Sequence, residues 1–418
     1  MSPTEPLPIV TARKPIVVMK FGGTSVADES GRAALAQRVR QAVDAGRAPV
    51  VVVSAMGRHG APYATDTLLG LVAELPSDER EADLLASVGE IISAVVVAHE
   101  LRAAGLDAMA FSGPEAGIVT DGVAGNSSVV EVYPGGLLDA IDAGRIPVVA
   151  GFQGMSADGR TTTLGRGGSD TSACALGVAL SAEEVEIYTD VDGVMTADPR
   201  TCDGAAVINV VGADELFQMA RAGSRVVHTA AAELALNSGI AVRVRSTFSD
   251  HNGTLVTDIA GYRPDSVATA VSHTIGVARI RVRLFAPEGT RQHMVTQTRI
   301  YRLMADARVS LDMFTPIGDE LVFTVQDADL LLATAVLDRI GLPHDARTGL
   351  AKVTLVGAGM HGVPGVMARM AEFLSAAGVD VYQTADSNTT ISVLVAVDQT
   401  QVAVRALHEG FQLGAYRV

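Results

Sequence analysis

The stretch VVMKFGGTSVADES, residues 17–30, places one lysine at the end of an apolar run and follows it with two glycines and two hydroxyl side chains. A β-branched run that ends in Gly-Gly is typical of a buried strand turning into a loop, because glycine lets the backbone turn and approach a ligand closely. The pattern therefore predicts that Lys20 brings a positive charge to the mouth of a sheet.

A second stretch, TTTLGRGGSDTSACALGVAL (161–180), has three glycines around Arg166 and leads into Ser169 or Asp170 as the expected N-cap of a helix. A helix N-terminus has free backbone N–H groups and favours anions. The stretch lacks GxGxxG, and the chain has no GxxxxGK followed by Ser or Thr, so neither a Rossmann cofactor site nor a Walker loop is supported. Taken alone, this loop is better explained as a plain tight turn.

A third stretch, IYTDVDGVMTADPRTC (187–202), gathers three aspartates near the end of an expected strand, with Thr189 and Arg200 beside them. Carboxylates and hydroxyls in that position suit a ribose, a Mg²⁺ ion or an ordered loop equally well. The spacing alone leaves these three possibilities open.

The elements that would position these residues follow from hydrophobic periodicity. Apolar β-branched runs at 15–20, 48–57, 145–154 and 184–190 alternate with helical patterns, such as the helix expected over about 31–45 with Gly46 at its end. Alternating strands and helices predict a mostly parallel sheet covered on both faces, with the ligand outside the carboxyl ends of the strands. Four glycine-bearing loops are expected to converge there.

The C-terminal third contains an internal repeat. A shift of 70 residues aligns RIYRLMADARVSLDM (299–313) with RMAEFLSAAGVDVYQ (369–383), and it also pairs Val325 with Val395 and Leu337 with Leu407. The kept register predicts two copies of one small αβ module, with chance similarity of two amphipathic helices as the alternative. The expected boundary before the repeat lies in 258–271, which mixes Gly, Pro and polar residues.

Composition limits the class of protein. The chain has 418 residues, so two or three domains of roughly 100 to 200 residues each are expected. The formal net charge of −15 argues against a general nucleic-acid binder. Cys174 and Cys202 are too few for a disulfide framework, and both are interpreted as reduced bystanders. The N-terminus shows no signal-peptide pattern and no window suits a membrane span, so a cytoplasmic protein with a flexible segment at 1–14 is expected.

Taken together, KFGGTSV, TTLGRGGSDTSA and YTDVDGVMTADPR resemble the signature segments of the aspartokinases, in the amino-acid kinase family. SAMGRHGAPYATDTLL, GEIIS, VGAGMHGVPGV and ADSNTTISVLV resemble the form found in Bacillus-type enzymes, so the resemblance covers nearly the whole chain. It implies an α/β fold with an amino-acid kinase domain at 15–262 and a regulatory region at 272–418. That region would hold two ACT modules of ferredoxin-like fold, about 272–345 and 346–418, whose strands could interleave.

The resemblance also implies an activity. Family enzymes use Mg²⁺ and ATP to phosphorylate the side-chain carboxylate of L-aspartate, giving 4-phospho-aspartate, the first step toward lysine, threonine and methionine. Phosphoryl transfer depends on positioning and on cations around the developing oxygen charge. Lys20 would contact the transferring group with the amides of Gly22, Gly23 and Thr24, and Asp170 would orient the lysine. No metal-ligating side chains are assigned.

The other site residues implied by the resemblance divide into two sides. Arg166 would bind the α-carboxylate of the substrate, for which a planar guanidinium is suited, and Glu90 would bind its α-ammonium group. Thr24 and Ser169 join this substrate side. The ATP side would be formed by Thr189, Asp190, Asp198, Arg200 and Arg225.

Two segments depart from the family pattern. Glu115 and Ser128 stand where the family tends to have a glutamine and a basic residue, and Arg225 stands where a lysine is usual. These changes favour, as an alternative, a related kinase for another acidic amino acid. A weakly active regulatory subunit that senses amino acids is a third hypothesis, against which the retained Lys20, Glu90, Arg166 and Asp170 argue.

Regulation and assembly are likewise implied only by the resemblance. An amino-acid effector would bind between ACT modules, which would make the protein a homodimer or larger, with no nucleic-acid or membrane partner. The sequence leaves open whether the effector is lysine, threonine or diaminopimelate, and whether a shorter subunit joins the assembly.

Overall fold

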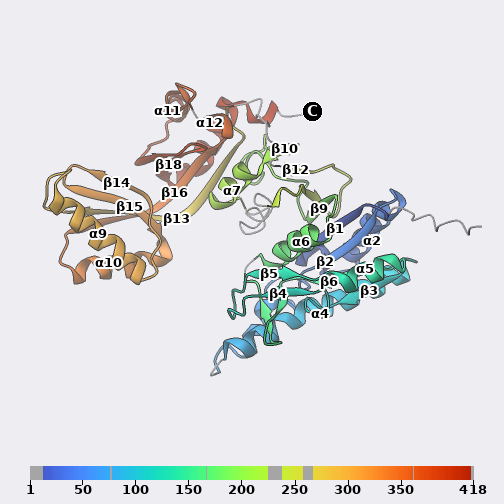
Figure 1. Ribbon diagram of the computed structural model, residues 1–418. Coiled ribbons are helices and arrows are strands. Elements are labelled where there is room, and N and C mark those ends of the chain that lie inside the picture. The colour runs from blue at the N-terminus through green and yellow to red at the C-terminus, as the bar shows by residue number, and fades with distance from the viewer. Residues whose placement is uncertain are drawn as a thin grey trace, which may run out of the picture. The chain divides into compact units, whose positions relative to one another are not determined.

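The computed structural model describes residues 13–75, 78–165, 167–224, 238–257, 267–360 and 362–415. They divide into two compact units (Figure 1). The first holds the described residues up to Val194, together with Asn209–Ala213 and 238–257, and the second holds Met195–Ile208, 214–224 and the described residues from 267 onward. Met195–Ile208 and 214–224 precede the expected boundary at 258–271, yet both segments belong to the same unit as the repeat.

The first unit is built on a mostly parallel sheet. Its described strands follow the order β10-β12-β11-β9-β1-β2-β6-β3, and β1 pairs in parallel with both β2 and β9, as the alternating pattern predicted. Among these described strands, β11 and β12 form the only antiparallel pair. The bounds are β1 (Ile16–Phe21), β2 (Ala48–Val53), β3 (Ala108–Phe111), β6 (Ile146–Ala150), β9 (Glu184–Thr189), β10 (Val210–Gly212), β11 (Val242–Ser246) and β12 (Thr254–Thr257).

A smaller sheet and several helices complete this unit. The small sheet has the order β5-β4-β7-β8, with bounds β4 (Ile118–Thr120), β5 (Val129–Val132), β7 (Gln153–Ser156) and β8 (Thr161–Thr163). The helices are α1 (Gly23–Val26), α2 (Glu29–Asp44), α3 (Thr65–Gly70), α4 (Glu79–Ala103), α5 (Gly135–Asp142) and α6 (Gly168–Ala179). The helix expected at about 31–45 is α2, and Gly46 follows it with a φ of +79°.

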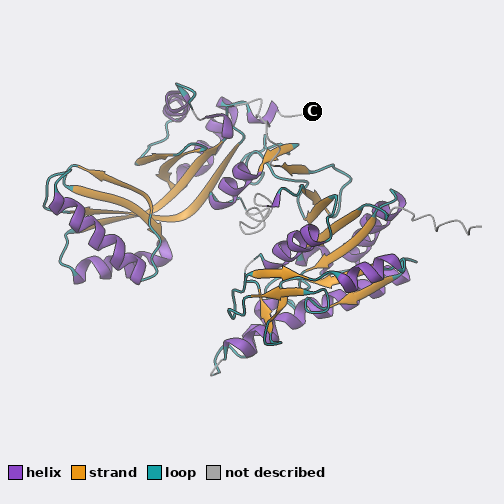
Figure 2. Cartoon of the chain, viewed as in Figure 1, coloured by secondary structure: helices purple, strands orange, loops and turns teal. Residues whose placement is uncertain are grey.

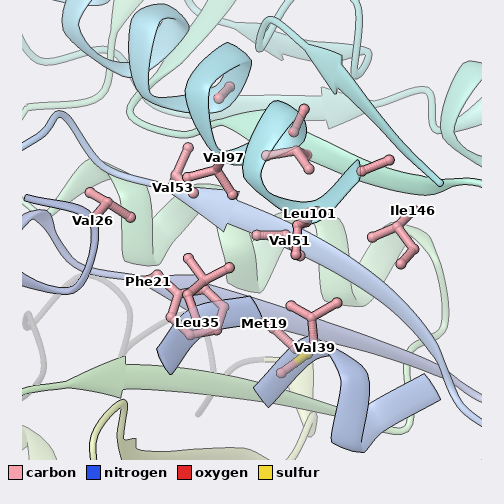
Figure 3. Packing of buried hydrophobic residues seen from close by; sticks show 14 of the residues in the cluster. Met19, Phe21, Val26, Leu35, Val39, Val51, Val53, Val97, Leu101 and Ile146 are labelled. Carbon is pink, nitrogen blue, oxygen red and sulfur yellow. The ribbon is translucent and has the colours of Figure 1, made fainter. Parts of the chain in front are cut away.

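The two faces of the main sheet explain where Lys20 points. Odd-numbered residues of β1 and β2 pack against α2 and α4 in one apolar cluster, in which Figure 3 labels Met19, Phe21, Leu35, Val51 and Val97. Successive strand side chains alternate between faces. Lys20 consequently points to the opposite face, where α6 packs against β1 and β2.

The second unit contains the repeat as six described strands in the order β14-β15-β13-β16-β18-β17, alternating with helices along the chain (Figure 2). β15 (Glu320–Gln326) and β18 (Thr390–Ala396) lie 70 positions apart, and the paired residues Val325, Val395, Leu337 and Leu407 are all buried. The remaining bounds are β13 (Ala270–Arg283), β14 (Asp312–Ile317), β16 (His344–Val356), β17 (Gln383–Asp386), α7 (Ala213–Arg221), α9 (Arg291–Asp306), α10 (Leu330–Arg339), α11 (Val366–Ala376) and α12 (Thr400–Gly410).

The two modules share their long strands. Ile280 and Val282, in the second half of β13, pack in the core of the first module, whereas Val271 in its first half packs in the core of the second. The register of β13 against β16 shifts on either side of Val277, next to Gly276 with its φ of +74°. The modules are therefore interleaved rather than arranged one after the other.

Candidate active site

The loops that follow β1, β2, β6 and β9 meet at one edge of the main sheet. The N–H of Gly57 donates to the carbonyl of Gly23 at 3.0 Å, and the N–H of Gly22 donates to the carbonyl of Tyr188 at 3.3 Å. The loop after β6 joins them through the N–H of Gly151, which donates to Val53 at 3.0 Å. This is the convergence expected at the carboxyl ends of parallel strands.

A buried ion pair lies at the centre of this edge. Lys20 Nζ is 2.6 Å from Asp170 Oδ1, and the two side chains are only 12% and 11% exposed. Lys20 is the last residue but one of β1, and Asp170 lies in the first turn of α6. An ammonium group held here by a carboxylate is oriented before any ligand arrives, which suits it to bind a phosphoryl group at a strand end.

The helix that carries Asp170 begins earlier than expected. Its N-cap is Gly167, with a φ of +76°, and neither Ser169 nor Asp170 takes that position. The expectation of a Ser or Asp N-cap was wrong because glycine adopts the left-handed backbone conformation needed there. Asp170 is thereby placed inside the first turn, where its side chain is free to pair with Lys20. Ser169, also buried, precedes it in that turn.

The two glycines after Lys20 differ in how closely other backbone atoms approach them. A Cβ on Gly23 would lie 2.6 Å from the carbonyl oxygen of Gly57 and 2.8 Å from that of Ala55. On Gly22, the nearest atoms would be 3.8 Å away. The chain therefore needs glycine at position 23 to bring the loop after β2 against the start of α1, where Thr24 is half-buried.

A pair of variants tests this close approach. Gly23→Ala is expected to lower the free energy of unfolding by about 1–3 kcal/mol, because backbone carbonyls cannot move aside as a flexible side chain can. Gly22→Ala serves as the matched control, since its backbone has a φ of −72° and ample space. Urea denaturation measures both. Equal losses in the two variants would contradict the close contact between the loops.

Glu90 reaches this edge from α4. Its side chain is 3% exposed, and Oε1 accepts a hydrogen bond from the N–H of Ala55 at 3.1 Å. Oε2 is buried and has no hydrogen-bond partner among the described residues. Burial raises the pKa of Glu90 to about 7, against the opposing effects of the Ala55 N–H and of the nearby Thr65 hydroxyl. A carboxylate with one oxygen unsatisfied is suited to accept a cationic ligand.

Asp83 is a second buried acid of α4, and sequence reasoning missed it. Its Oδ1 accepts hydrogen bonds from Thr163 Oγ1 at 2.6 Å and from the N–H of Gly125 at 2.9 Å. These contacts join α4 to β8 and to the loop before Ser127, so Asp83 positions the chain that leads into α6. The signal was available, because Asp83 and Glu90 lie seven residues apart on one face of α4 and are the only charged residues between Ala82 and Ala98.

β9 ends at Thr189, and Asp190 follows it at the same sheet edge. Thr189 Oγ1 donates to Asp190 Oδ1 at 3.1 Å, and Arg58 Nη2 lies 3.1 Å from Asp190 Oδ2. Arg58 comes from the loop after β2 and was not predicted as a site residue. Both partners of this ion pair are largely exposed, so it contributes little to stability, and its effect is to join two of the converging loops.

Asp198 and Arg200 pair with each other in the second unit. Asp198 Oδ1 accepts from Arg200 Nε at 3.0 Å, and Oδ2 accepts from Nη2 at 2.7 Å. These bonds hold the pKa of Asp198 below its usual value. Their segment is fixed to α12: Thr196 Oγ1 lies 2.9 Å from His408 Nε2, and Arg405 Nε donates to the Thr201 carbonyl at 3.1 Å.

Two of the predicted site residues, Arg166 and Arg225, lie outside the described residues. The two altered positions, Glu115 and Ser128, are described. Glu115 is exposed, and its Oε2 accepts hydrogen bonds at 2.8 Å from both the N–H and the hydroxyl of Ser112. The N–H of Ser128 donates to Asp121 Oδ1 at 3.2 Å. Both altered positions therefore have partners within their own loop.

The two cysteines are free and buried, as expected of bystanders. Burial, with a contribution from the Asp170 carboxylate, raises the pKa of Cys174 to about 12. Its thiol consequently stays protonated at neutral pH, although it lies one helical turn from Asp170.

Comparisons with known proteins identify the family of this chain. The model of the amino acid kinase family matches residues 15–246, and an ACT domain model matches residues 345–409. The chain is 42% identical to aspartokinase 1 of Bacillus subtilis over 405 residues, which is 95% of this chain and 99% of that protein.

Solved structures are also similar to this chain over most of its length. The crystal structure of E. coli aspartokinase III in complex with aspartate and ADP has a TM-score of 0.76 and 25% identity, covering 95% of this chain and all of that chain. The same enzyme in complex with lysine and aspartate has a TM-score of 0.77 at 25% identity, covering 95% and 99%. This chain therefore belongs to the aspartokinases, within the amino acid kinase family.

Proposed function

We propose that this chain transfers the γ-phosphoryl group of ATP to the side-chain carboxylate of L-aspartate, giving 4-phospho-L-aspartate, the first step toward lysine, threonine and methionine. The observation that carries the proposal is the buried Lys20–Asp170 pair, set at the same sheet edge as Glu90, which has an unsatisfied oxygen. The Lys20 side chain is suited to bind a phosphoryl group, and the Glu90 carboxylate is suited to bind an ammonium group. An α-amino acid with an acidic side chain presents both charges to such a site.

Lys20 would stabilise the negative charge that develops on the transferring group. The amides of Gly22, Gly23 and Thr24 would assist it, because glycine lets the backbone approach a phosphate. Asp170 would keep the ammonium group in place between turnovers. No general base is required, because the attacking carboxylate is already ionised at neutral pH.

Glu90 and Arg166 would recognise the substrate as an α-amino acid. The free Oε2 of Glu90 would accept a hydrogen bond from the α-ammonium group, and Arg166 would bind the α-carboxylate in a bidentate manner. Ser169 lies between Arg166 and Asp170 in the chain and would contact the substrate with Thr24. Asp83 would keep the surrounding loop in position.

The nucleotide would lie on the side of β9. Thr189 and Asp190 would face the ribose. The family resemblance makes Arg200 and Arg225 the candidates for phosphate contacts, and Asp198 would hold Arg200 in orientation. Arg58, paired with Asp190, is a further candidate on this side. Arginine at position 225 would act as a planar donor, which differs from the point charge of a lysine.

Mg²⁺ would accompany ATP. In the described part of the chain, no three His, Cys, Asp or Glu side chains cluster in a way that could hold a metal ion. Mg²⁺ is commonly held by substrate phosphates with one or two carboxylates, so a dedicated protein cage is not required. When bound, the ion would offset charge on the phosphate oxygens.

The decisive assay supplies Mg²⁺ and ATP with L-aspartate and traps the acyl phosphate with hydroxylamine. The panel includes L-glutamate, N-acetyl-glutamate and unusual acidic amino acids. Hydroxamate formed from aspartate in preference to the others is the expected result. Turnover of another acid without aspartate would instead support the related-kinase alternative. No turnover with any acid, from a folded protein, would leave the amino-acid-sensing subunit.

The ACT modules would regulate this activity. An amino-acid effector would bind at an interface between modules, in a homodimer or larger assembly working in the cytoplasm. Such an effector must favour one arrangement of the modules over another, since equal affinity for both shifts nothing. Lysine, threonine or diaminopimelate at millimolar concentration is expected to lower turnover, and flat activity with all three would contradict regulation by these amino acids.

A further inference from the structure

Two arginines stand directly opposite each other on adjacent strands of the second unit. Arg279 of β13 is the register partner of Arg347 of β16, and on the other side of β13 it is the partner of Thr324 of β15 (Figure 1). Directly opposite side chains of such strands have Cβ atoms roughly 4.5–5.5 Å apart, and like charges in this position are destabilising. Arg347, Arg279 and Thr324 therefore form one row across three strands, which we call the cross-strand row.

The cross-strand row lies on the face of the sheet opposite to α9 and α10. Ala278, Ile280 and Phe323 pack with residues of these two helices in the core of the first module. Successive side chains of a strand point to opposite faces. Arg279 and Thr324, which lie between or beside these core residues in the chain, consequently point to the face without the helices.

Tyr382, directly before β17, lies against both arginines. The centroid of its ring is 3.8 Å from Arg347 Cζ and 6.0 Å from Arg279 Cζ. The carbonyl of Tyr382 accepts a hydrogen bond from Arg279 Nη1 at 2.9 Å. Stacking on a ring uses the flat face of a guanidinium group and leaves the N–H groups at its edge free to donate. Tyr382 thus holds both guanidinium groups in place before any ligand is bound.

The carboxylates near the cross-strand row belong to a different arginine. Glu320 Oε2 lies 3.4 Å from Arg281 Nε, and Asp345 is the register partner of Arg281. In the part of the chain that the structure describes, neither Arg279 nor Arg347 forms an ion pair. Burial and the charges of Arg281 and Arg347 lower the pKa of Arg279, against the opposing effect of Asp345. The charges of Arg279 and Arg347 therefore lack an anion.

Thr324 adds an unused hydroxyl group to the row. Its side chain is only 1% exposed, and Oγ1 is buried with no hydrogen-bond partner among the described residues. Leaving a buried hydroxyl unpaired is unfavourable, so such a group indicates a bound ligand or an ordered water. Arg347, at the other end of the row, is exposed, which leaves a way in from solvent.

We propose that Arg347, Arg279 and Thr324 bind a phosphate group, either inorganic phosphate or the phosphate of a small ester. A phosphate ester carries a charge of about −1.5 to −2 at neutral pH, which two guanidinium groups offset. Guanidinium groups bind phosphate oxygens in a bidentate manner, and the hydroxyl of Thr324 donates to a further oxygen. A carboxylate has one charge and two oxygens, so it would satisfy one arginine and leave the other unpaired. The site lies within the second unit and does not depend on the proposed kinase activity.

Isothermal titration calorimetry of the full chain with inorganic phosphate tests the site. Arg279→Gln and Arg347→Gln are each expected to weaken phosphate binding about 10- to 100-fold, because each removes charged hydrogen bonds. Arg302→Gln, at an exposed position of α9, makes the same change of charge and is the matched control. Its affinity for phosphate should equal that of the wild type.

Two further titrations identify the source of the phosphate and separate the two sites. Phosphate bound by Lys20 would be lost in Lys20→Met, whereas phosphate bound by the cross-strand row should remain. Titration with glycerol 3-phosphate distinguishes the free anion from an ester. Tighter binding of glycerol 3-phosphate than of inorganic phosphate would support an ester, and weaker binding would support the free anion.

Thr324→Val gives a second, independent readout. In phosphate-free buffer the Tm of the variant is expected to exceed that of the wild type, because the variant has no unpaired buried hydroxyl. Saturating phosphate should raise the Tm of the wild type more than that of the variant and so narrow this difference. Phosphate also stabilises proteins in general by exclusion from their surface, but that effect would raise both Tm values equally.

Three results would overturn the proposal. One is wild-type affinity for phosphate in both arginine variants, and another is a rise in Tm that is the same for Thr324→Val and the wild type. The third is a change of particle mass in sedimentation velocity for the arginine variants while their affinity for phosphate is unchanged. That result would mean that the cross-strand row faces an acidic surface of a second copy. Far-UV circular dichroism checks that each variant is folded.

Discussion

Lys20→Met is expected to lower kcat by about 10³-fold, because it removes a preorganised cation from the position where charge develops on the transferring phosphoryl group. Lys20 Nζ lies 2.6 Å from Asp170 Oδ1 in a largely buried pair, so its position is already set before substrates bind. The KM values for aspartate and ATP should change much less than kcat. Coupled measurement of ADP release gives both constants.

The same substitution also affects folding, which must be separated from its effect on catalysis. Removing one partner of a buried ion pair leaves an uncompensated charge and costs roughly 3–5 kcal/mol. The double variant Lys20→Met/Asp170→Asn removes both charges and should recover most of that stability in urea denaturation. It should not recover turnover. A double variant with near wild-type activity would show that Lys20 only offsets Asp170 and does not act on the substrate.

Glu90→Gln is expected to raise the KM for aspartate about 10- to 100-fold, since a hydrogen bond to a charged group contributes roughly 1.5–3 kcal/mol. The KM for ATP should be unchanged. Glu90 Oε2 is buried with no partner among the described residues, so the α-ammonium group would supply the interaction that the free protein lacks. An ammonium partner would also lower the pKa of Glu90. Aspartate binding near pH 7 should therefore release protons, which calorimetry in buffers of different ionisation enthalpy detects.

In the absence of aspartate, the titration of Glu90 should lower the free energy of unfolding as the pH rises. The pKa of Glu90 is raised from 4.5 to about 7 in the fold by burial, so the folded protein binds a proton more tightly than the unfolded chain does. This contribution to stability is fully present below pH 4.5 and is lost as the pH rises to about 7. The loss amounts to roughly 3 kcal/mol.

Glu90→Gln removes this titration. The variant is expected to exceed the wild type in free energy of unfolding by up to about 3 kcal/mol at pH 8, and to match it near pH 4.5. Glu74→Gln, at an exposed position, is the control and should change stability little at either pH. If Glu90→Gln gave the same difference at both pH values, the carboxyl group would not be the cause.

The local pattern of the chain determined much of the fold. The run before Lys20 predicted a strand that ends in a close turn, and the structure has β1 followed directly by the tight approach at Gly23. The shift of 70 residues predicted two equivalent modules, and β15 and β18 reproduce it. These features could be predicted because periodicity and the conformational freedom of glycine depend on neighbouring residues alone.

The ion pair was within reach of the sequence only through the resemblance. Residues 20 and 170 are far apart in the chain, and no spacing rule joins them. No spacing rule joins Asp83 to its partner Thr163 in β8 either, although the position of Asp83 on α4 could have been noticed. The N-cap of α6 was predicted wrongly because residue preference at a helix start was outweighed by the backbone conformation that Gly167 adopts.

Tertiary packing alone decided which environment each residue has. Met195–Ile208 belongs to the second unit because Ala197 and Cys202 are buried with Leu407 and Phe411, about two hundred positions away in the chain. Glu90 and Ile91 are neighbours in α4, yet Glu90 is buried with its pKa raised to about 7, while Ile91 faces solvent. The sequence by itself determined the elements and the order of their loops. Burial, and with it the pKa of Glu90, depends on contacts between distant segments, which no local pattern contains.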